Sequence, residues 1–256
     1  MHEHPIRRPK GDPWTIARDA FSPTNQPYID DRRLRTLADL SSLFRGIAPS
    51  DCTRLAASAR LKRFERGEVL HAEGEIVQRV HLLNKGVAKI TQLGTQGSEV
   101  ILKLAIPGEL LGAVSLFSNG RYCTTTQAFR QCEAFVWEAQ VFRGFVNNLP
   151  PLKRNILRIL VQYLEELEER FREVSTERVA PRVARQVARL ADRIGQSVND
   201  TIEIALSREE LAQMTGTTLF TVSRLISAWE ARGFVKARRE AVAIRDLASL
   251  QAVADE

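Results

Sequence analysis

The sequence lacks the features of a membrane, secreted or metal-cluster protein. No apolar run approaches the roughly 18 residues of a membrane span, and the N-terminus MHEHPIRRPKGDPW has no apolar segment for a secretory signal. The three cysteines, Cys52, Cys123 and Cys132, are widely spaced and odd in number. They are typical of a reducing compartment and include no Cys-x-x-Cys ligand pair. We therefore predict a cytoplasmic protein that does not enter a membrane.

A strong charge of one sign is also missing. The 256 residues carry a net charge of +6, and residues 179–256 hold 11 basic and 10 acidic side chains. Bulk charge alone thus argues slightly against nucleic-acid binding by this part of the chain. The composition, 44% hydrophobic and 27% charged, is that of a globular protein, and the length allows two domains.

The clearest pattern runs from Ser207 to Gly233, SREELAQMTGTTLFTVSRLISAWEARG. Ser207 and Glu210 have the spacing of a capping box at the start of a helix. Gly216 then breaks the helical pattern, as a tight turn requires. A threonine caps a second helix, which ends at Gly233. This order predicts a helix-turn-helix.

The second of these helices has two distinct faces. One is apolar at helical spacing and carries Val222, Leu225, Ile226 and Trp229. The other carries Leu219, Phe220, Ser223 and Arg224. An exposed arginine one turn into a recognition helix can bind guanine through two hydrogen bonds, which favours DNA binding over an ordinary helical hairpin.

The segment after Gly233 has the pattern of a wing. Phe234–Ala237 and Ala241–Arg245 are predicted strands, joined by a polar turn at Arg238–Glu240. Local basic residues of the helix and wing offset the weak overall charge. The candidate DNA-binding residues are Thr218, Leu219, Phe220, Thr221, Ser223, Arg224, Lys236, Arg238 and Arg239.

Short strand-like runs occupy the middle of the chain, after a predicted helix around Pro49 to Ala59. They are Arg60–Glu65, Glu68–Ala72, Val80–Asn84, Val87–Leu93, Glu99–Leu104, Thr125–Phe129 and Cys132–Glu138. Turns with Gly, Asn or Pro separate them, a spacing typical of a β-sandwich or jelly roll.

A long helix follows from near Pro151, and another covers Pro181 to Gly195. The long helix carries an apolar stripe of Ile156, Leu160, Tyr163, Leu167, Phe171 and Val174. Such a stripe needs a partner, which is either the β domain or a second copy of the helix. We favour a homodimer seam, because two helix-turn-helix units bind two half-sites.

These elements predict an α+β chain in four parts. Residues 1–36 form a flexible tail, residues 37–150 a β-roll or jelly roll, residues 151–178 a dimerisation helix, and residues 179–256 a winged helix-turn-helix. His2 and His4 in the tail are potential metal ligands, but we favour a flexible terminus without a metal site.

The ordered set of motifs resembles the CRP/FNR family of bacterial transcription regulators over about residues 37–256. The motifs are Arg66-Gly67-Glu68, Glu73-Gly74, Leu82-Leu83-x-x-Gly86, Pro107-Gly108-Glu109 with Gly112, Leu211-Ala212, Thr221-Val222-Ser223-Arg224 and Ile244-x-Asp246. The resemblance implies a homodimeric regulator that binds palindromic double-stranded DNA and works with RNA polymerase. It also implies an effector domain on the N-terminal side.

Members of the family that bind cyclic nucleotides carry Gly-Glu and, further on, Arg-Ser or Arg-Thr, whose Glu holds the ribose and whose Arg holds the phosphate. In this sequence Ala113 follows Gly112, while Tyr122 and Cys123 stand at the Arg and Ser positions. Arg121 is one residue early. We therefore expect an effector other than cyclic AMP. The candidate pocket residues are Gly112, Ala113, Arg121, Tyr122, Cys123, Thr124, Leu167 and Glu168.

The resemblance leaves the cofactor unknown. The tail has no cysteine for an iron–sulfur cluster, and Leu82 and Asn84 stand where the family's carbon monoxide sensor has its heme ligands. Heme held by other ligands stays open, with His81 nearest. A thiol switch at Cys123 or Cys132 is a further alternative.

Other classes of function find less support in the sequence than a regulator. A jelly-roll metal enzyme needs a His-x-His pair, which His71 and His81, ten residues apart, do not form. No catalytic or metal site is predicted. The alternatives are a cyclic-nucleotide-responsive regulator with a rearranged phosphate site and a jelly-roll ligand- or metal-binding protein that does not bind DNA.

Overall fold

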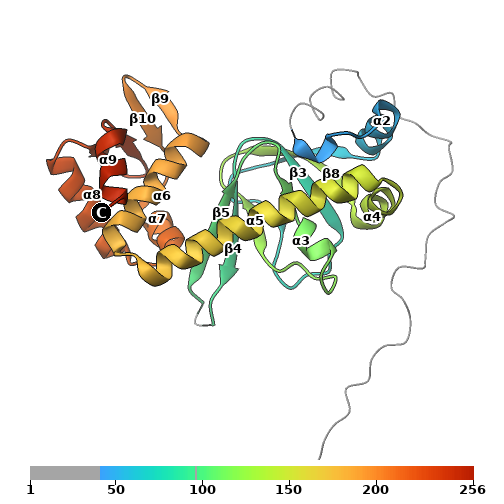
Figure 1. Ribbon diagram of the computed structural model, residues 1–256, viewed down its shortest axis with the longest axis horizontal. Helices are drawn as coiled ribbons and strands as arrows, with labels where there is room; N and C mark the ends of the chain where they lie inside the picture. The colour runs from blue at the N-terminus through green and yellow to red at the C-terminus, as the bar shows by residue number, and fades with distance from the viewer. Residues whose placement is uncertain (1–40, 96) are drawn as a thin grey trace, which may run out of the picture.

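The computed structural model describes residues 41–95 and 97–256. The tail predicted for residues 1–36, with His2 and His4, lies outside the described residues. Within them, a β-rich domain and a C-terminal domain are joined by one long helix, as Figure 1 shows. The predicted α+β class is confirmed.

Two antiparallel sheets form the β-rich domain. The first has the order β1 (Arg60–Phe64), β8 (Cys132–Glu138), β3 (Arg79–Lys85), β6 (Leu110–Leu111). The second has the order β2 (Val69–His71), β7 (Thr125–Ala128), β4 (Ala88–Leu93), β5 (Glu99–Ala105). Buried residues of both sheets, among them Phe64, Leu83, Ala105 and Ala128, pack against one another between them. All the predicted strand runs in this domain are present, with ends that differ by a residue or two.

Helices close the outer side of the first sheet. They are η1 (Ser42–Phe44), α2 (Pro49–Ala57) and α4 (Ala139–Asn148), and they share a core with the start of the long helix α5 (Pro150–Thr176). In α2, Leu55 and Ala56 are buried against this core. The structure also contains three elements that were not predicted: α4, β6 and the short α3 (Ala113–Leu116), which follows Gly112.

The helix α5 runs beside the β-rich domain and ends at the C-terminal domain (Figure 1). Pro150 and Pro151 occupy its first turn, where a backbone N–H has no partner within the helix and proline therefore costs no hydrogen bond. Its 27 residues span about 40 Å. The helix is therefore long enough to run along the β-rich domain and reach the C-terminal domain.

The C-terminal domain contains α6 (Val179–Ile194), β9 (Gln196–Val198), β10 (Thr201–Ile204), α7 (Arg208–Thr215), α8 (Leu219–Ala231), β11 (Val235–Ala237), β12 (Val242–Ile244) and α9 (Leu247–Ala254). Its antiparallel sheet has the order β11-β12-β10-β9. The helix α9 was not predicted, and it packs against α6.

One core cluster crosses between the domains. Val87, Ile101, Leu104 and Phe129 of the β-rich domain belong to the same buried cluster as the core of the C-terminal domain. The strand β5 contacts α7 directly. A rearrangement of either domain therefore disturbs apolar packing that both share. No helix within the described ranges is long and apolar enough to cross a bilayer.

Candidate functional site

The turn between α7 and α8 is built by the predicted local signals. The side chain of Ser207 accepts a hydrogen bond from the Glu210 amide (3.1 Å), and the Glu210 carboxylate accepts one from the Ser207 amide (2.7 Å). Gly216 has a φ of +59°, a left-handed conformation that glycine adopts without strain. Thr218 caps α8 by accepting from the Thr221 amide (3.2 Å). The capping box and the turn are confirmed.

The helix α8 turns its apolar face inward and leaves the other face open. Val222, Ile226 and Trp229 are buried. Leu219 is 49% exposed and Phe220 76% exposed, although both are large and apolar. Arg224 is also exposed, one turn further along. The inward position of Val222 explains why Phe220 points outward.

A wing lies beside this face. The strands β11 and β12 pair in antiparallel register, and Lys236 and Arg239 are exposed. Arg238 forms an ion pair with Glu203 of the neighbouring strand (2.5 Å). An open hollow brings together side chains of α7, α8 and the wing, namely Ser207, Arg208, Glu209, Leu219, Ser223, Ala237, Arg238 and Arg239. The recognition face and the wing therefore border one surface.

A second cavity, which we call the effector pocket, lies between the β-rich domain and α5. Its volume is about 180 Å³. Four of the residues predicted for this site line it: Gly112, Ala113, Cys123 and Thr124. Much of the remaining wall is apolar and includes Ile90, Leu110, Leu111, Ile159 and Leu160.

The other four predicted pocket residues do not line this cavity. The Arg121 guanidinium donates to the Gly74 carbonyl (2.7 Å). Tyr122 is buried, and its hydroxyl donates to the Arg79 carbonyl (2.8 Å). Leu167 and Glu168 lie further along α5, where Glu168 is exposed. No arginine lines the described part of the pocket.

Two histidines lie beneath this region. The ring of His71 stacks on Tyr122 at 4.0 Å and lies 5.6 Å from the ring of His81. Burial lowers the pKa of His71 to about 4. Burial, together with the positive forms of His71, Arg79 and Lys62, lowers the pKa of His81 to about 3. Both rings are neutral at pH 7 and neither lines the pocket.

Four charged residues, which we call the bridging cluster, connect the pocket to the C-terminal domain. Lys103 contacts Glu109 (3.3 Å) and Glu166 of α5 (2.9 Å). Arg193 of α6 in turn contacts Glu109 (2.5 Å) and lies 3.9 Å from Glu166. Sequence reasoning missed this cluster, because its members are far apart in the chain and show no local pattern.

The match to known protein families agrees with this geometry. A model of the cyclic nucleotide-binding domain matches residues 61–148, and a model of the Crp-like helix-turn-helix domain matches residues 181–253. The chain belongs to the CRP/FNR family of transcription regulators.

Curated relatives in the CRP/FNR family share about a quarter of the sequence. A CRP-like cAMP-activated global transcriptional regulator of Mycobacterium tuberculosis is 26% identical over 80% of this chain and 93% of its own length. The nitrogen fixation regulation protein FixK of Bradyrhizobium diazoefficiens is 26% identical over 90% of this chain and 95% of its own.

Solved CRP/FNR structures share the fold. The c-di-GMP responsive global regulator CLP of Xanthomonas campestris matches with a TM-score of 0.69 and 18% identity, covering 77% of this chain and 99% of that one. A CRP/FNR-family transcriptional regulator of Thermus thermophilus matches with a TM-score of 0.68 and 20% identity, covering 77% and 99%.

In this CRP/FNR chain, the helix α5 carries two apolar faces where one was predicted. Ile156 is buried inside the chain, and Leu160 and Tyr163 line the effector pocket. Contrary to the prediction of a dimer seam, Ile156 therefore packs inside the chain, and the structure places Leu160 and Tyr163 on the side of the pocket. Phe171 and Val174 of the same stripe are exposed.

The exposed apolar face of α5 is offset by one residue from the predicted stripe. Leu157, Val161 and Leu164 are 54%, 54% and 55% exposed, and Phe171 is 76% exposed. Their spacing of four, three and seven residues keeps them on one line of the helix. Glu168 occupies the remaining position of this line. The signal was present in the sequence as a second apolar stripe next to the first.

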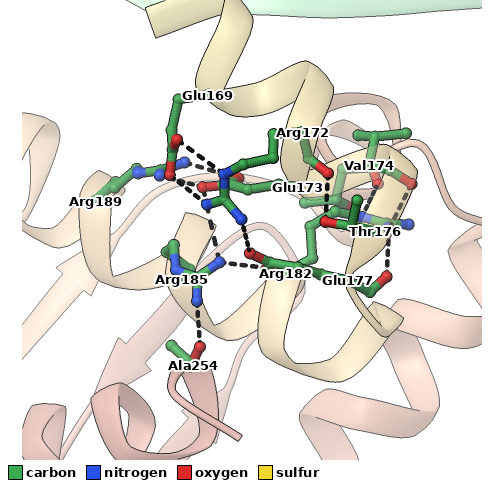
Figure 2. Close-up of polar contacts among 11 residues, drawn as sticks. Glu169, Arg172, Glu173, Val174, Thr176, Glu177, Arg182, Arg185, Arg189 and Ala254 are labelled. Atoms are coloured by element: carbon green, nitrogen blue, oxygen red, sulfur yellow. Dashed lines mark hydrogen bonds and ion pairs between the residues drawn. The ribbon is translucent and has the colours of Figure 1, made fainter.

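Polar contacts fix the end of α5 against α6, as Figure 2 shows. Glu173 is 3% exposed and accepts from Arg189 (3.0 Å). Arg182 donates to the Thr215 carbonyl of α7 (2.9 Å), and Arg185 donates to Ala254 of α9. A buried carboxylate needs such partners to remain charged. These contacts join the end of α5 to α6, and they join α6 to α7 and α9.

Metal binding finds no support in the part of the chain that the structure describes. It contains no group of three or more His, Cys, Asp or Glu side chains placed to hold an ion. The imidazole of His81, the nearest heme candidate, is 1% exposed and packs between Phe64 and His71.

Proposed function

We propose that this protein is a cytoplasmic, homodimeric regulator that binds a palindromic DNA site and responds to an effector other than cyclic AMP. The observation that carries the proposal is the open recognition face of α8, with Phe220, Ser223 and Arg224 beside the basic wing. Exposed apolar side chains are unexpected there unless a partner covers them. In this proposal RNA polymerase is the protein partner, and the relatives are regulators and not enzymes.

The proposed DNA contacts follow from the position of each side chain. Arg224 reads a guanine, and Ser223 contacts a neighbouring base or phosphate. Leu219 and Phe220 pack against a thymine methyl group, since neither accepts a hydrogen bond. Thr218 and Thr221 at the helix start, and Lys236, Arg238 and Arg239 of the wing, contact the backbone.

The homodimer proposal rests on the exposed apolar face of α5. Leu157, Val161, Leu164 and Phe171 supply the apolar positions of a two-stranded seam, and the same face of a second copy is their partner. The seam includes Glu168, which meets its equivalent across the two-fold axis. The two recognition helices then reach half-sites about one helical turn, roughly 34 Å, apart.

The four-part division of the chain is part of the same proposal. Residues 37–150 form the effector domain, residues 151–178 the dimerisation helix and residues 179–256 the DNA-binding domain, preceded by the tail at residues 1–36. The described elements support the boundary between residues 178 and 179, because α5 ends at Thr176 and α6 begins at Val179.

Cyclic AMP is disfavoured by the charges of the pocket. One relative is named as cAMP-activated, but this chain has Ala113 and Tyr122 where the nucleotide-binding pattern has Glu and Arg. Tyr122 is turned into the domain, and Arg121 binds Gly74. Calorimetry with millimolar cyclic AMP should therefore give no binding heat. Micromolar binding would contradict this part of the proposal.

Selection of binding sites from random double-stranded DNA tests the regulator itself. We expect a palindrome with half-sites one helical turn apart and with binding that weakens as salt rises. An Arg232→Ala variant is the matched control for Arg224→Ala, because Arg232 lies at the far end of α8 and stacks on Phe234. Binding that is blind to sequence would refute the proposal.

A further inference from the structure

The charged side chains of the effector pocket already satisfy one another. Lys103, Glu109 and Glu166 line the cavity, and Lys103 contacts both carboxylates. Its side chain is only 12% exposed. Both carboxylates also approach Arg193, so the two cations and two anions balance.

A ligand that carries a charge has no free partner in this arrangement. An anion must take Lys103 from two carboxylates and then sit beside both of them. A cation must compete with Lys103 and Arg193 for the same oxygens. Since removing one member of a partly buried ion-pair network leaves the others unpaired, both exchanges are costly. The pocket therefore favours a ligand without formal charge.

Several polar side chains of the pocket remain available to such a ligand, the Tyr163 hydroxyl among them. Ser42, Thr124 and Gln162 line the cavity, and their side chains make no hydrogen bond within the described residues. By contrast, Ser115 is engaged by Cys123, and Thr126 by His71. The available groups are hydroxyls and an amide, which bind a neutral hydroxyl, carbonyl or amide equally well.

The size of the cavity limits the ligand further. Its volume is about 180 Å³, comparable with a protein cavity of about 150 Å³ that holds benzene. The surface of its wall is mostly apolar, with Leu110, Leu111 and Leu160 among the residues that form it.

We propose that the effector pocket takes a small uncharged molecule, of about the size of a single substituted ring, held by its apolar body and by one or two hydrogen bonds. The inference rests on the proposed function, in which this domain senses an effector. The ligand lies against Lys103 and Glu166, and Arg193 connects the same cluster to the DNA-binding domain. One ion pair, between Glu166 and Arg193, therefore separates the bound ligand from α6.

Cys123 gives a direct measure of occupancy, because it is the cysteine that lines the pocket. The full-length protein is alkylated with iodoacetamide, and mass spectrometry follows Cys123 and Cys52 separately. Cys52 lies outside the pocket and serves as the internal control. The probes are benzyl alcohol and benzamide, with benzoate and cyclic AMP as charged counterparts.

We expect the neutral probes to slow alkylation of Cys123 about tenfold at ten times their dissociation constant, because only the empty pocket reacts. Alkylation of Cys52 should not change. Benzoate should require at least about a tenfold higher concentration than benzyl alcohol, since it must disturb the bridging cluster. A Thr124→Arg variant should reverse this preference by adding an unpaired cation, whereas Thr124→Gln should not.

Equal protection by benzoate or cyclic AMP would overturn the proposal, and so would a lack of protection by every neutral probe up to its solubility. Site selection with the same protein preparation separates this result from the proposed function. Specific DNA binding without protection refutes only the ligand class. Protection of Cys123 without specific DNA binding refutes the regulator and leaves the pocket assignment in place.

Discussion

The two buried histidines of the β-rich domain predict a specific loss of stability in acid. His71 and His81 are 4% and 1% exposed, and their pKa values fall from 6.5 to about 4 and about 3. In the unfolded chain both titrate near the ordinary value. Between pH 6.5 and about 4 the unfolded state therefore binds more protons than the folded state, so the free energy of unfolding decreases as the pH is lowered.

The size of this loss follows from the two pKa values of each ring. Lowering the pH from 7 to 5 costs about 2 kcal/mol for each histidine, because both folded pKa values lie below 5 and the unfolded value sets the result. Both together cost about 4 kcal/mol, a large share of the stability of an ordinary domain.

Replacement of one ring isolates its contribution. His81 has an Nδ1 atom that is buried without a hydrogen bond, so His81→Leu should cost little at pH 7. Between pH 7 and pH 5, the free energy of unfolding of the variant should fall by about 2 kcal/mol less than that of the unchanged protein. His71→Leu should show the same gain, but it leaves the buried Thr126 hydroxyl without its partner and should cost about 1 kcal/mol at pH 7.

Urea unfolding at pH 7 and pH 5, followed by tryptophan fluorescence, measures these differences. Trp137 is fully buried in the same domain and reports its unfolding. Contributions from carboxylates cancel when a variant is compared with the unchanged protein. If His81→Leu and the unchanged protein lose the same free energy between the two pH values, His81 is not held neutral by burial and the reasoning fails.

Three further predictions concern DNA binding and assembly. Arg224→Ala should weaken binding by about 1–3 kcal/mol and relax preference at one base pair; a uniform loss in gel shifts on all sequences would make Arg224 a phosphate contact instead. Phe220→Glu should shift site selection toward C·G next to the guanine, because a carboxylate accepts from cytosine N4; strong C·G enrichment by the unchanged protein would contradict this. Leu164→Glu should give a monomer in light scattering while Gln162→Glu, exposed on the same helix, stays dimeric; a dimer in both would exclude this face as the seam.

Local signals allowed the helix-turn-helix to be predicted almost completely. The caps and the left-handed turn formed by Ser207, Glu210 and Gly216 involve only backbone groups a few residues away in the chain. Their effect can therefore be predicted from their spacing. The strands of the β-rich domain were readable for a related reason, because glycine-containing turns separate short runs. The short elements β6 and α3 were missed, since they have too few residues for a period to show, and the longer helices α4 and α9 were missed as well.

Long-range contacts decided which predicted pocket residues face the cavity. Tyr122 looked like a pocket residue from its place in the motif, yet its ring stacks on His71 and its hydroxyl binds Arg79. Lys103 and Arg193, 90 residues apart in the numbering, carry no sign in the sequence that they share Glu109 and Glu166.

The sequence by itself determined that α5 is a long amphipathic helix, and it determined which face of α8 is buried and which is exposed. It contained two apolar stripes on α5, one that includes Leu160 and one that includes Leu164. The second stripe is shifted by one residue relative to the first, which is about 100° of rotation. Helical periodicity cannot rank such stripes, because each satisfies the same spacing. Only the tertiary structure assigned them, by packing Leu160 against the effector pocket and leaving Leu164 open to solvent.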